Sequence, residues 1–143
     1  MKRASAFLLP CVAFAFLVFT APLVHGQIAN QIDADIHHSF IVGNATLPPG
    51  HYEFRTLQGT DMLAMVVTSV DGRAGAEFLV RNSIDSQVPN HTELIFDRFG
   101  NKEFLAHMYE AGNKVGVAVI EPSREESRLL KQGQVPVRHT EEQ

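Results

Sequence analysis

Cysteine is nearly absent from this sequence of 143 residues, and its one cysteine, Cys11, lies in the N-terminal segment described below. A chain that loses this segment has no disulfide, no thiolate nucleophile and no thiolate ligand for a metal. A cysteine-free exported domain of this size is more typical of a bacterial envelope than of an animal secretory pathway, where small domains rely on disulfide bridges.

Runs of charge of one sign are also absent. The chain has 12 basic and 16 acidic residues, which are scattered singly and form no basic stripe. Without Lys2 and Arg3, ten basic residues stand against sixteen acidic ones, a net charge of −6. This balance argues against nucleic acid and against an anionic membrane surface as partners.

The apolar run near the N-terminus is too short to cross a membrane. It covers the fourteen residues Ala6–Phe19, whereas a membrane-spanning helix needs about 20. Two basic residues precede it, and Val24-His25-Gly26 follows with the small or compact residues of a cleavage site. Residues 1–26 are therefore predicted to be a signal peptide. The mature chain of 117 residues would have no transmembrane span and would be secreted or periplasmic.

The mature chain has the two-residue alternation of apolar and polar residues that is typical of β-strands. Alternating stretches recur about every ten to fifteen residues between Ile36 and Ala111, separated by turn residues. This pattern predicts an all-β fold, an antiparallel meander of six or seven strands that forms a small barrel or sandwich. The expected strands are 36–43, 51–57, 62–69, 75–82, 92–99, 102–110 and 115–120.

Two turns have specific predicted conformations. Pro49 and Gly50 fit the central positions of a type II turn, in which the glycine takes a positive φ. Asp71-Gly72 predicts a type I′ hairpin, in which both central residues take a positive φ. Gly43 is expected to allow a bulge or a tight exit at a strand end.

The C-terminal region is predicted to hold one short helix followed by a tail. Ser123 is expected to cap the start of the helix and Gly133 to end it. Only two leucines in this helix are apolar, so it must pack them on the sheet to persist. The all-β domain with its C-terminal helix thus spans residues 27–133, and residues 134–143 are predicted to be a disordered tail.

A sequence motif begins within the first predicted strand, 36–43. Its fixed positions are Phe40, Val42, Gly43, Leu47, Pro48, Gly50 and Tyr52. Written as F-x-V-G-x-x-x-L-P-x-G-x-Y, it resembles a motif of a family of short exported bacterial proteins of uncharacterised function. The resemblance extends more loosely over most of the mature chain and implies no particular activity. His37-His38 stands where that family tends to have Pro-Phe, and we interpret the motif residues as structural.

One group of metal-ligating residue types lies near the mature N-terminus. Asp33, Asp35 and His37 alternate, so on a strand they would share one face and could converge on a divalent metal. The competing interpretation is a solvated edge strand, whose charges protect against aggregation. We favour the edge strand and therefore predict no metal and no cofactor. If a metal did bind, these three residues would be its candidate ligands. Further histidines that could add ligands from neighbouring strands are His38, His51, His91 and His107.

Catalytic patterns are not found. The serines lack a G-x-S-x-G context. Glu93, Asp97 and Glu103 could pair for sugar hydrolysis, but Arg98 and Lys102 lie beside them to neutralise their charge. We therefore predict no catalytic residues and a non-enzymatic exported protein that acts in binding or in envelope association, with an unknown protein as its partner. The alternative is a carrier of a small apolar ligand in a β-barrel interior, and a metal-binding protein is the third possibility.

Overall fold

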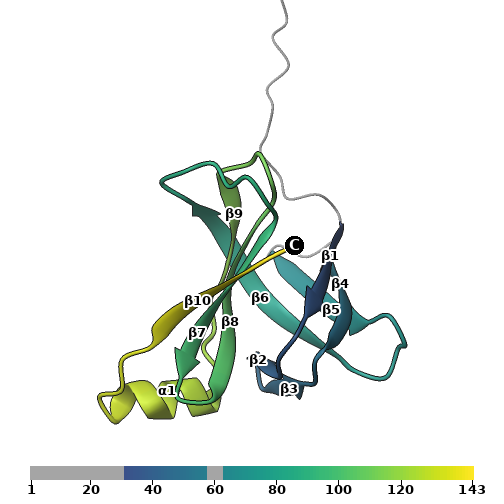
Figure 1. The fold of residues 1–143 in the computed structure, drawn as a ribbon. Coiled ribbons are helices and arrows are strands. Elements are labelled where there is room, and N and C mark those ends of the chain that lie inside the picture. Colours follow the sequence, from purple (N-terminus) through teal and green to yellow (C-terminus); the bar gives the residue numbers. More distant parts are fainter. Residues whose placement is uncertain (1–30, 58–62) are drawn as a thin grey trace, which may run out of the picture.

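The computed structural model describes residues 31–57 and 63–143, which form one strongly curved sheet and one short helix (Figure 1). The all-β class with a C-terminal helix is confirmed. The signal peptide and the first residue of the predicted strand 62–69 lie outside the described residues. The elements are β1 (Gln31–Ile36), β2 (Phe40–Val42), β3 (Ala45–Leu47), β4 (Gly50–Leu57), β5 (Ala64–Ser69), β6 (Gly75–Ile84), β7 (Glu93–Phe99), β8 (Lys102–Tyr109), β9 (Val115–Val119), α1 (Arg124–Lys131) and β10 (Val137–Glu142).

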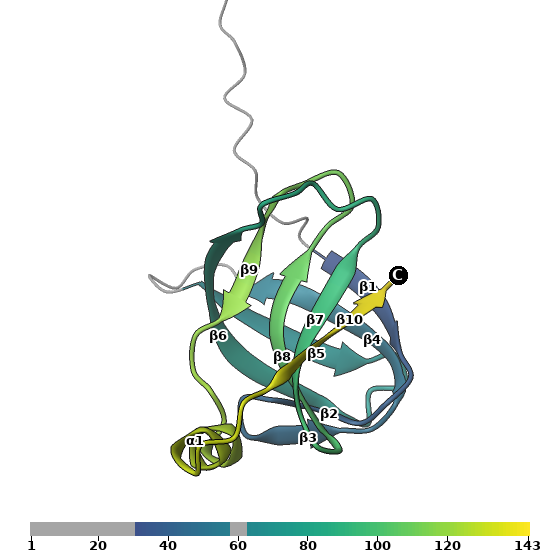
Figure 2. The same cartoon turned by 60° about the vertical axis from the view of Figure 1, so that its left-hand side comes forward.

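The long strand β6 joins the two halves of the sheet. Its first half pairs with β5 and its second half with β9, so the order runs β1-β4-β5-β6-β9-β8. β7 and β10 follow β8, and the β2–β3 hairpin joins β8 through a parallel pairing of β2. Figure 2 shows that the curvature places β4 and β5 opposite β7 and β8.

The predicted barrel is wrong, because the sheet does not close. Among the described residues, three strands lie at an edge: β1 pairs only with β4, β10 only with β7, and β3 only with β2. β1 and β10 are the two ends that approach each other. Polar side chains rather than a backbone ladder connect the two ends, as described below. The result is an open sheet folded over one interior.

Apolar side chains from both halves fill this interior. Phe40, Tyr52, Phe54 and Phe96 are almost completely buried. The Phe40 ring meets the rings of Tyr52 and Phe96 edge-on, at centroid distances of 5.2 and 5.9 Å. Leu47 is buried with them. The motif residues Phe40, Leu47 and Tyr52 therefore belong to the core.

Both predicted turn conformations are wrong, although the hairpin between β5 and β6 is confirmed. Gly50 begins β4 opposite Ile36 and has no positive φ; the Tyr52 hydroxyl closes this turn instead, donating to the Pro48 carbonyl at 2.6 Å. In the β5–β6 connection only Gly72 takes a positive φ, 71°. Asp71 does not, because its carboxylate accepts hydrogen bonds from Ser69 Oγ and the Arg73 N–H within a longer, five-residue turn, 70–74.

The predicted strand 36–43 is two strands. The chain turns at residues 37–39, between β1 and β2, because β1 pairs with β4 whereas β2 pairs with β3 and β8. Gly43, with a φ of 57°, then provides the expected tight exit from β2 into β3.

The predicted disordered tail is wrong as well. Residues 134–143 contain β10, which runs antiparallel to β7 from the pair Val137–Arg98 to the pair Glu142–Glu93. Disorder was predicted because the segment is polar and contains Pro136. Its one apolar strand residue, Val137, is indeed not packed in the core and is 67% exposed. Backbone pairing and polar contacts, which a hydrophobic pattern does not report, hold the strand.

The helix α1 begins and ends as predicted. Ser123 Oγ accepts a hydrogen bond from the Glu126 N–H at 3.0 Å, and Gly133 takes a φ of 78° just after the last turn. Leu129 packs against Phe99 and Phe104, whereas the second leucine of the helix stays largely exposed. No helix in residues 31–57 and 63–143 has the length and apolar character to cross a bilayer.

Candidate metal centre

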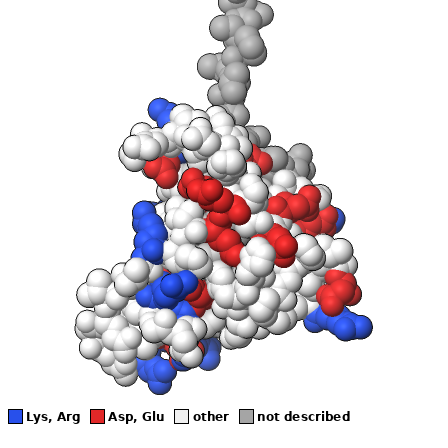
Figure 3. Space-filling model, in the orientation of Figure 1, with Lys and Arg blue, Asp and Glu red and all other residues white. Residues whose placement is uncertain are grey.

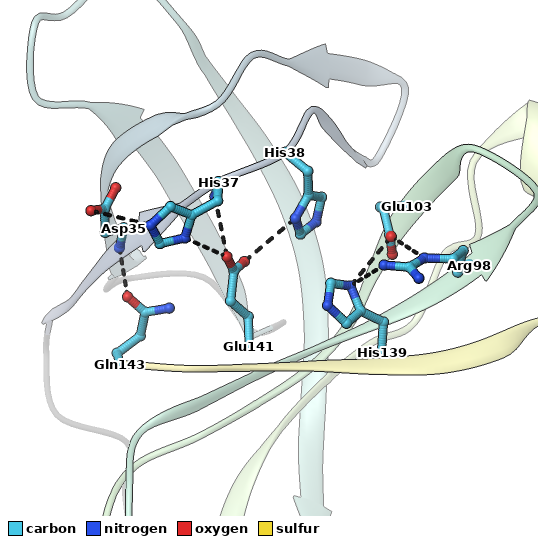
Figure 4. A network of polar contacts seen from close by, with 8 residues as sticks. All are labelled: Asp35, His37, His38, Arg98, Glu103, His139, Glu141 and Gln143. Carbon is cyan, nitrogen blue, oxygen red and sulfur yellow. Dashed lines mark hydrogen bonds and ion pairs between the residues drawn. The ribbon is translucent and has the colours of Figure 1, made fainter.

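The two ends of the sheet meet through side chains at a region that we call the seam, where β10 approaches β1 and the β1–β2 connection. Glu141 Oε1 accepts a hydrogen bond from the His37 backbone N–H at 3.1 Å and lies 2.8 Å from His37 Nδ1. Gln143 Oε1 accepts a hydrogen bond from the Asp35 N–H at 2.6 Å. Figure 4 shows that these contacts tie the C-terminal strand to the N-terminal one.

His37 and His38 are adjacent at the seam but have opposite surroundings. The His37 side chain is 75% exposed, and its hydrogen bond to Glu141 raises its pKa, with a further contribution from Asp35. The His38 side chain is 23% exposed, and its ring meets Phe96 edge-on at 4.8 Å. Burial lowers the pKa of His38. His38 is thereby held in the neutral form that binds metal ions.

Glu103 of β8 and His139 of β10 complete a cluster with His38. One ligand atom from each of the three lies within 4.8 Å of those of the other two. The Glu103 side chain is only 7% exposed, and the rings of His38 and His139 lie 5.2 Å apart. Three segments that are distant in the sequence thus bring two imidazoles and one carboxylate together (Figure 4).

Two polar atoms of this cluster and one of the neighbouring Glu141 have no hydrogen bond within the part of the chain that the structure describes. His38 Nε2, Glu103 Oε2 and Glu141 Oε2 are buried and have no hydrogen-bond partner among the described residues. Leaving such an atom without a hydrogen bond costs about 1–3 kcal/mol, so a ligand that pairs with these atoms would stabilise the fold. Glu141 Oε2 lies 3.7 Å from His38 Nδ1. This carboxylate favours a proton on Nδ1 and leaves Nε2 as a lone pair, as carboxylates do behind metal-binding histidines.

Arg98 provides a positive charge beside the cluster. Its Nε donates to Glu103 Oε1, and its Nη2 lies 2.9 Å from His139 Nδ1. Arginine can only donate, so Nδ1 of His139 is an acceptor in this contact. The same Nδ1 lies 3.2 Å from Glu103 Oε1, which places two acceptors next to one cationic group. Ligand atoms on a tetrahedral zinc ion are about 3.3 Å apart, given zinc–ligand bonds of about 2.0–2.1 Å. The Arg98 side chain is 42% exposed and can turn to solvent when a metal ion takes its place.

The ligands predicted from the sequence lie elsewhere. Asp33 and Asp35 share the outward face of β1, as expected from the alternation. Asp33 accepts a hydrogen bond from Gln31. Asp35 lies 3.8 Å from His37 Nε2 and 3.4 Å from His51 Nδ1, so these groups form exposed ion pairs and are not part of the buried cluster.

Two of the three clustered residues were not predicted as ligands. His139 lies in the segment that was predicted to be disordered, and Glu103 was considered only as a carboxylate for sugar hydrolysis that neighbouring basic residues neutralise. One available pattern was the alternation of Val137, His139 and Glu141, which is that of a strand. His38 was foreseen only as an additional ligand. His91 is exposed, and His107 instead faces Ser83 Oγ at 3.4 Å.

Acidic side chains surround the seam. Figure 3 shows them gathered where β10 approaches β1 and β4. The acidic residues of these strands are Asp33, Asp35, Glu53, Glu141 and Glu142. Such a group of carboxylates raises the local concentration of cations near the cluster.

No protein-family model, curated protein or solved structure matches this chain. The assignment of the candidate centre therefore rests on its own geometry and chemistry.

Proposed function

We propose that this protein is an exported, non-enzymatic binding domain of the bacterial envelope that captures a divalent transition-metal ion. His38, Glu103 and His139 would be its ligands. The observation that carries the proposal is the cluster itself, with Glu103 buried between two partly buried histidines, in which Glu103 Oε2 and His38 Nε2 have no hydrogen-bond partner among the described residues. Export is supported by the predicted signal peptide, residues 1–26, and by the resemblance to short exported bacterial proteins.

The ligand set selects the class of metal. Two neutral imidazoles and one carboxylate suit zinc, copper, nickel or iron. Magnesium and calcium prefer sites with more oxygen ligands. The mature chain has no thiolate to offer. Zinc is therefore the natural probe ion, because it binds such sets without redox chemistry.

Capture fits the surroundings of the cluster better than catalysis or apolar-ligand transport. Three protein ligands leave a fourth position, which in catalytic zinc sites faces a substrate cleft. The clefts at residues 48–52 with 69–74 and between β3 and α1 include none of the three ligands. A carrier of a small apolar ligand would need a hollow interior, whereas this interior is occupied by packed aromatic and aliphatic side chains.

A zinc titration of the mature chain, residues 27–143, tests the proposal. The protein carries no histidine tag and competes with a chromophoric chelator for zinc. We expect one zinc ion per chain. The variants H38Q and H139Q should each weaken binding by about 100-fold or more, because loss of a ligand exceeds the 10–100-fold cost of losing a group that only orients one.

His91→Gln is the matched control, since it removes an exposed histidine outside the cluster. It should leave the zinc affinity unchanged. If H38Q and H139Q bind zinc as tightly as H91Q does, the proposed centre is wrong.

A further inference from the structure

We infer that β10 is a detachable strand which the metal ion holds in place, and that the edge of β7 uncovered by its release binds β10 of a second copy of this chain. The regulation of strand release by metal rests on the proposed metal centre, whereas the exchange between copies does not. Figures 1 and 2 show β10 at the outside of the sheet beside β7, with the C-terminus next to β1.

β10 is attached without apolar burial. None of its six side chains is buried, and Val137, its apolar residue, is 67% exposed. Apart from its backbone ladder with β7 and the ring of His139 near that of Phe96, it is held by polar contacts of His139, Glu141 and the following Gln143. Release of such a strand withdraws none of its own apolar side chains from the core.

The metal ligands lie on both sides of this attachment. His139 belongs to β10, whereas His38 and Glu103 belong to the body of the domain. An ion bound by all three joins the strand to the body. Because the ion binds the attached state better than the released one, it must shift the equilibrium toward attachment.

Release of β10 uncovers a specific surface. β7 pairs with β8 on one edge and with β10 on the other, over six residue pairs. The uncovered edge presents unpaired N–H and C=O groups, which bind another strand. The segment whose register already fits this edge is β10, so a second copy is the best-matched occupant.

The connection to β10 suits such an exchange. Only residues 132–136 separate α1 from β10, and they include Gly133 and Pro136. Short connections before a terminal element favour exchange between copies. In the exchanged dimer each centre would combine His38 and Glu103 of one copy with His139 of the other.

Cysteine cross-linking tests this exchange, because the mature chain contains no cysteine of its own. Glu93 of β7 and Glu142 of β10 are direct partners. The Cα atoms of such partners lie about 4.5–5.5 Å apart, within reach of a disulfide. The variant E93C is mixed with the variant E142C at high concentration with a metal chelator, and the mixture is then oxidised. The E93C–E142C linked peptide is quantified by mass spectrometry.

The control mixture replaces E93C with E77C, since Glu77 is exposed on β6 and is not paired with β10. We expect the E93C–E142C link to exceed the control about tenfold. Saturating zinc added before mixing should slow the formation of the link by at least about tenfold, because the ion stabilises the attached strand, which must be released before it can exchange. A yield equal to the control overturns the exchange. If the yield exceeds that of the control mixture but zinc does not change it, then metal does not regulate the exchange. The titration of H38Q and H139Q decides separately whether the metal centre exists.

Hydrogen exchange of the unmodified chain provides an independent measurement. In chelator, the amides of β10 should exchange much faster than those of β4, and zinc should slow the β10 amides selectively. Equal protection of both strands in chelator would contradict a detachable β10.

Discussion

Two edge strands of the sheet, β1 and β10, have the same length but are held in different ways. In β1 the inward residues Ile32, Ala34 and Ile36 are all buried in the core. In β10 no side chain is buried, and the least exposed ones are the polar His139 and Glu141. Burial of side chains holds the first strand, whereas backbone pairing and polar contacts hold the second.

The largest expected effect is a difference in stability between variants of the two strands. Ile36→Ala should lower the free energy of unfolding by about 2–5 kcal/mol, because it removes a fully buried side chain and leaves a cavity. His139→Ala, in metal-free protein, should cost about 1 kcal/mol or less, since its side chain is 30% exposed. Urea unfolding of both variants in chelator measures the difference. Equal losses would remove the distinction between the strands.

Glu103→Gln should abolish tight zinc binding, with a loss of affinity of about 100-fold or more. The amide keeps the shape of the side chain but carries no charge for the ion. Zinc should then no longer raise the melting temperature, whereas it should raise that of the parent protein, because an ion that binds only the folded state stabilises it. Unaltered zinc stabilisation of E103Q would exclude Glu103 as a ligand.

Arg98→Met should change metal affinity and stability in opposite directions. Removing the guanidinium leaves Glu103 and His139 free for the ion, so zinc affinity should rise about tenfold, or about 1.4 kcal/mol. The metal-free protein should lose about 1–3 kcal/mol of stability, because the buried carboxylate loses its donor. Paired titration and unfolding experiments test both signs, and weaker zinc binding by R98M would mean that Arg98 supports the centre instead of competing for it.

Acid should destabilise the protein through His107, on the other face of β8. Burial lowers the pKa of His107, and Arg138 of β10 lowers it further. The unfolded chain therefore takes up a proton that the folded chain does not, and the free energy of unfolding falls as the pH drops below 6.5 toward the lowered pKa. The other groups that act on His107 are Asp97, Arg81 and Asp85, with Ser83 and Tyr109 in contact.

His107→Gln should flatten this fall by removing the titrating group while keeping a polar side chain toward Ser83. Urea midpoints of the parent protein and of H107Q, measured in chelator across this pH range, give the comparison. Parallel curves for the two proteins would assign the acid sensitivity to other groups.

The smallest effect is expected at the outward face of β1. Asp33→Asn should leave zinc affinity within about twofold and stability within about 0.5 kcal/mol, because Asp33 is exposed and contacts only another exposed side chain, that of Gln31. The same zinc titration measures it. A large loss of zinc affinity would indicate that the metal site is instead the one that the sequence pattern suggested, at Asp33, Asp35 and His37.

Local patterns predicted the fold better than they predicted the site. The alternation of Tyr52 and Phe54, the hairpin at Gly72 and the Ser123 cap all follow from neighbouring residues, and the structure contains each of them. The predictions of the exact turn conformations were wrong because side-chain hydrogen bonds of Tyr52 and Asp71 determine those conformations. Such contacts leave no trace in residue periodicity.

The candidate centre could not be assembled from the sequence because its parts are too far apart along the chain. His38 and His139 are about a hundred residues apart, and they meet only because β10 crosses to the seam. Aspartates two residues apart looked more like a ligand set than a histidine and a glutamate on different strands. Burial, which distinguishes His38 from His37, depends on the packing of Phe96 and so on the complete fold.

X-ray absorption spectroscopy of the zinc-loaded mature chain tests the central claim most directly. The account predicts two imidazole nitrogens and at least one carboxylate oxygen at about 2.0–2.2 Å from the zinc ion, with the imidazole signal halved in H139Q. A spectrum with oxygen ligands alone, or one that H139Q leaves unchanged, would contradict it.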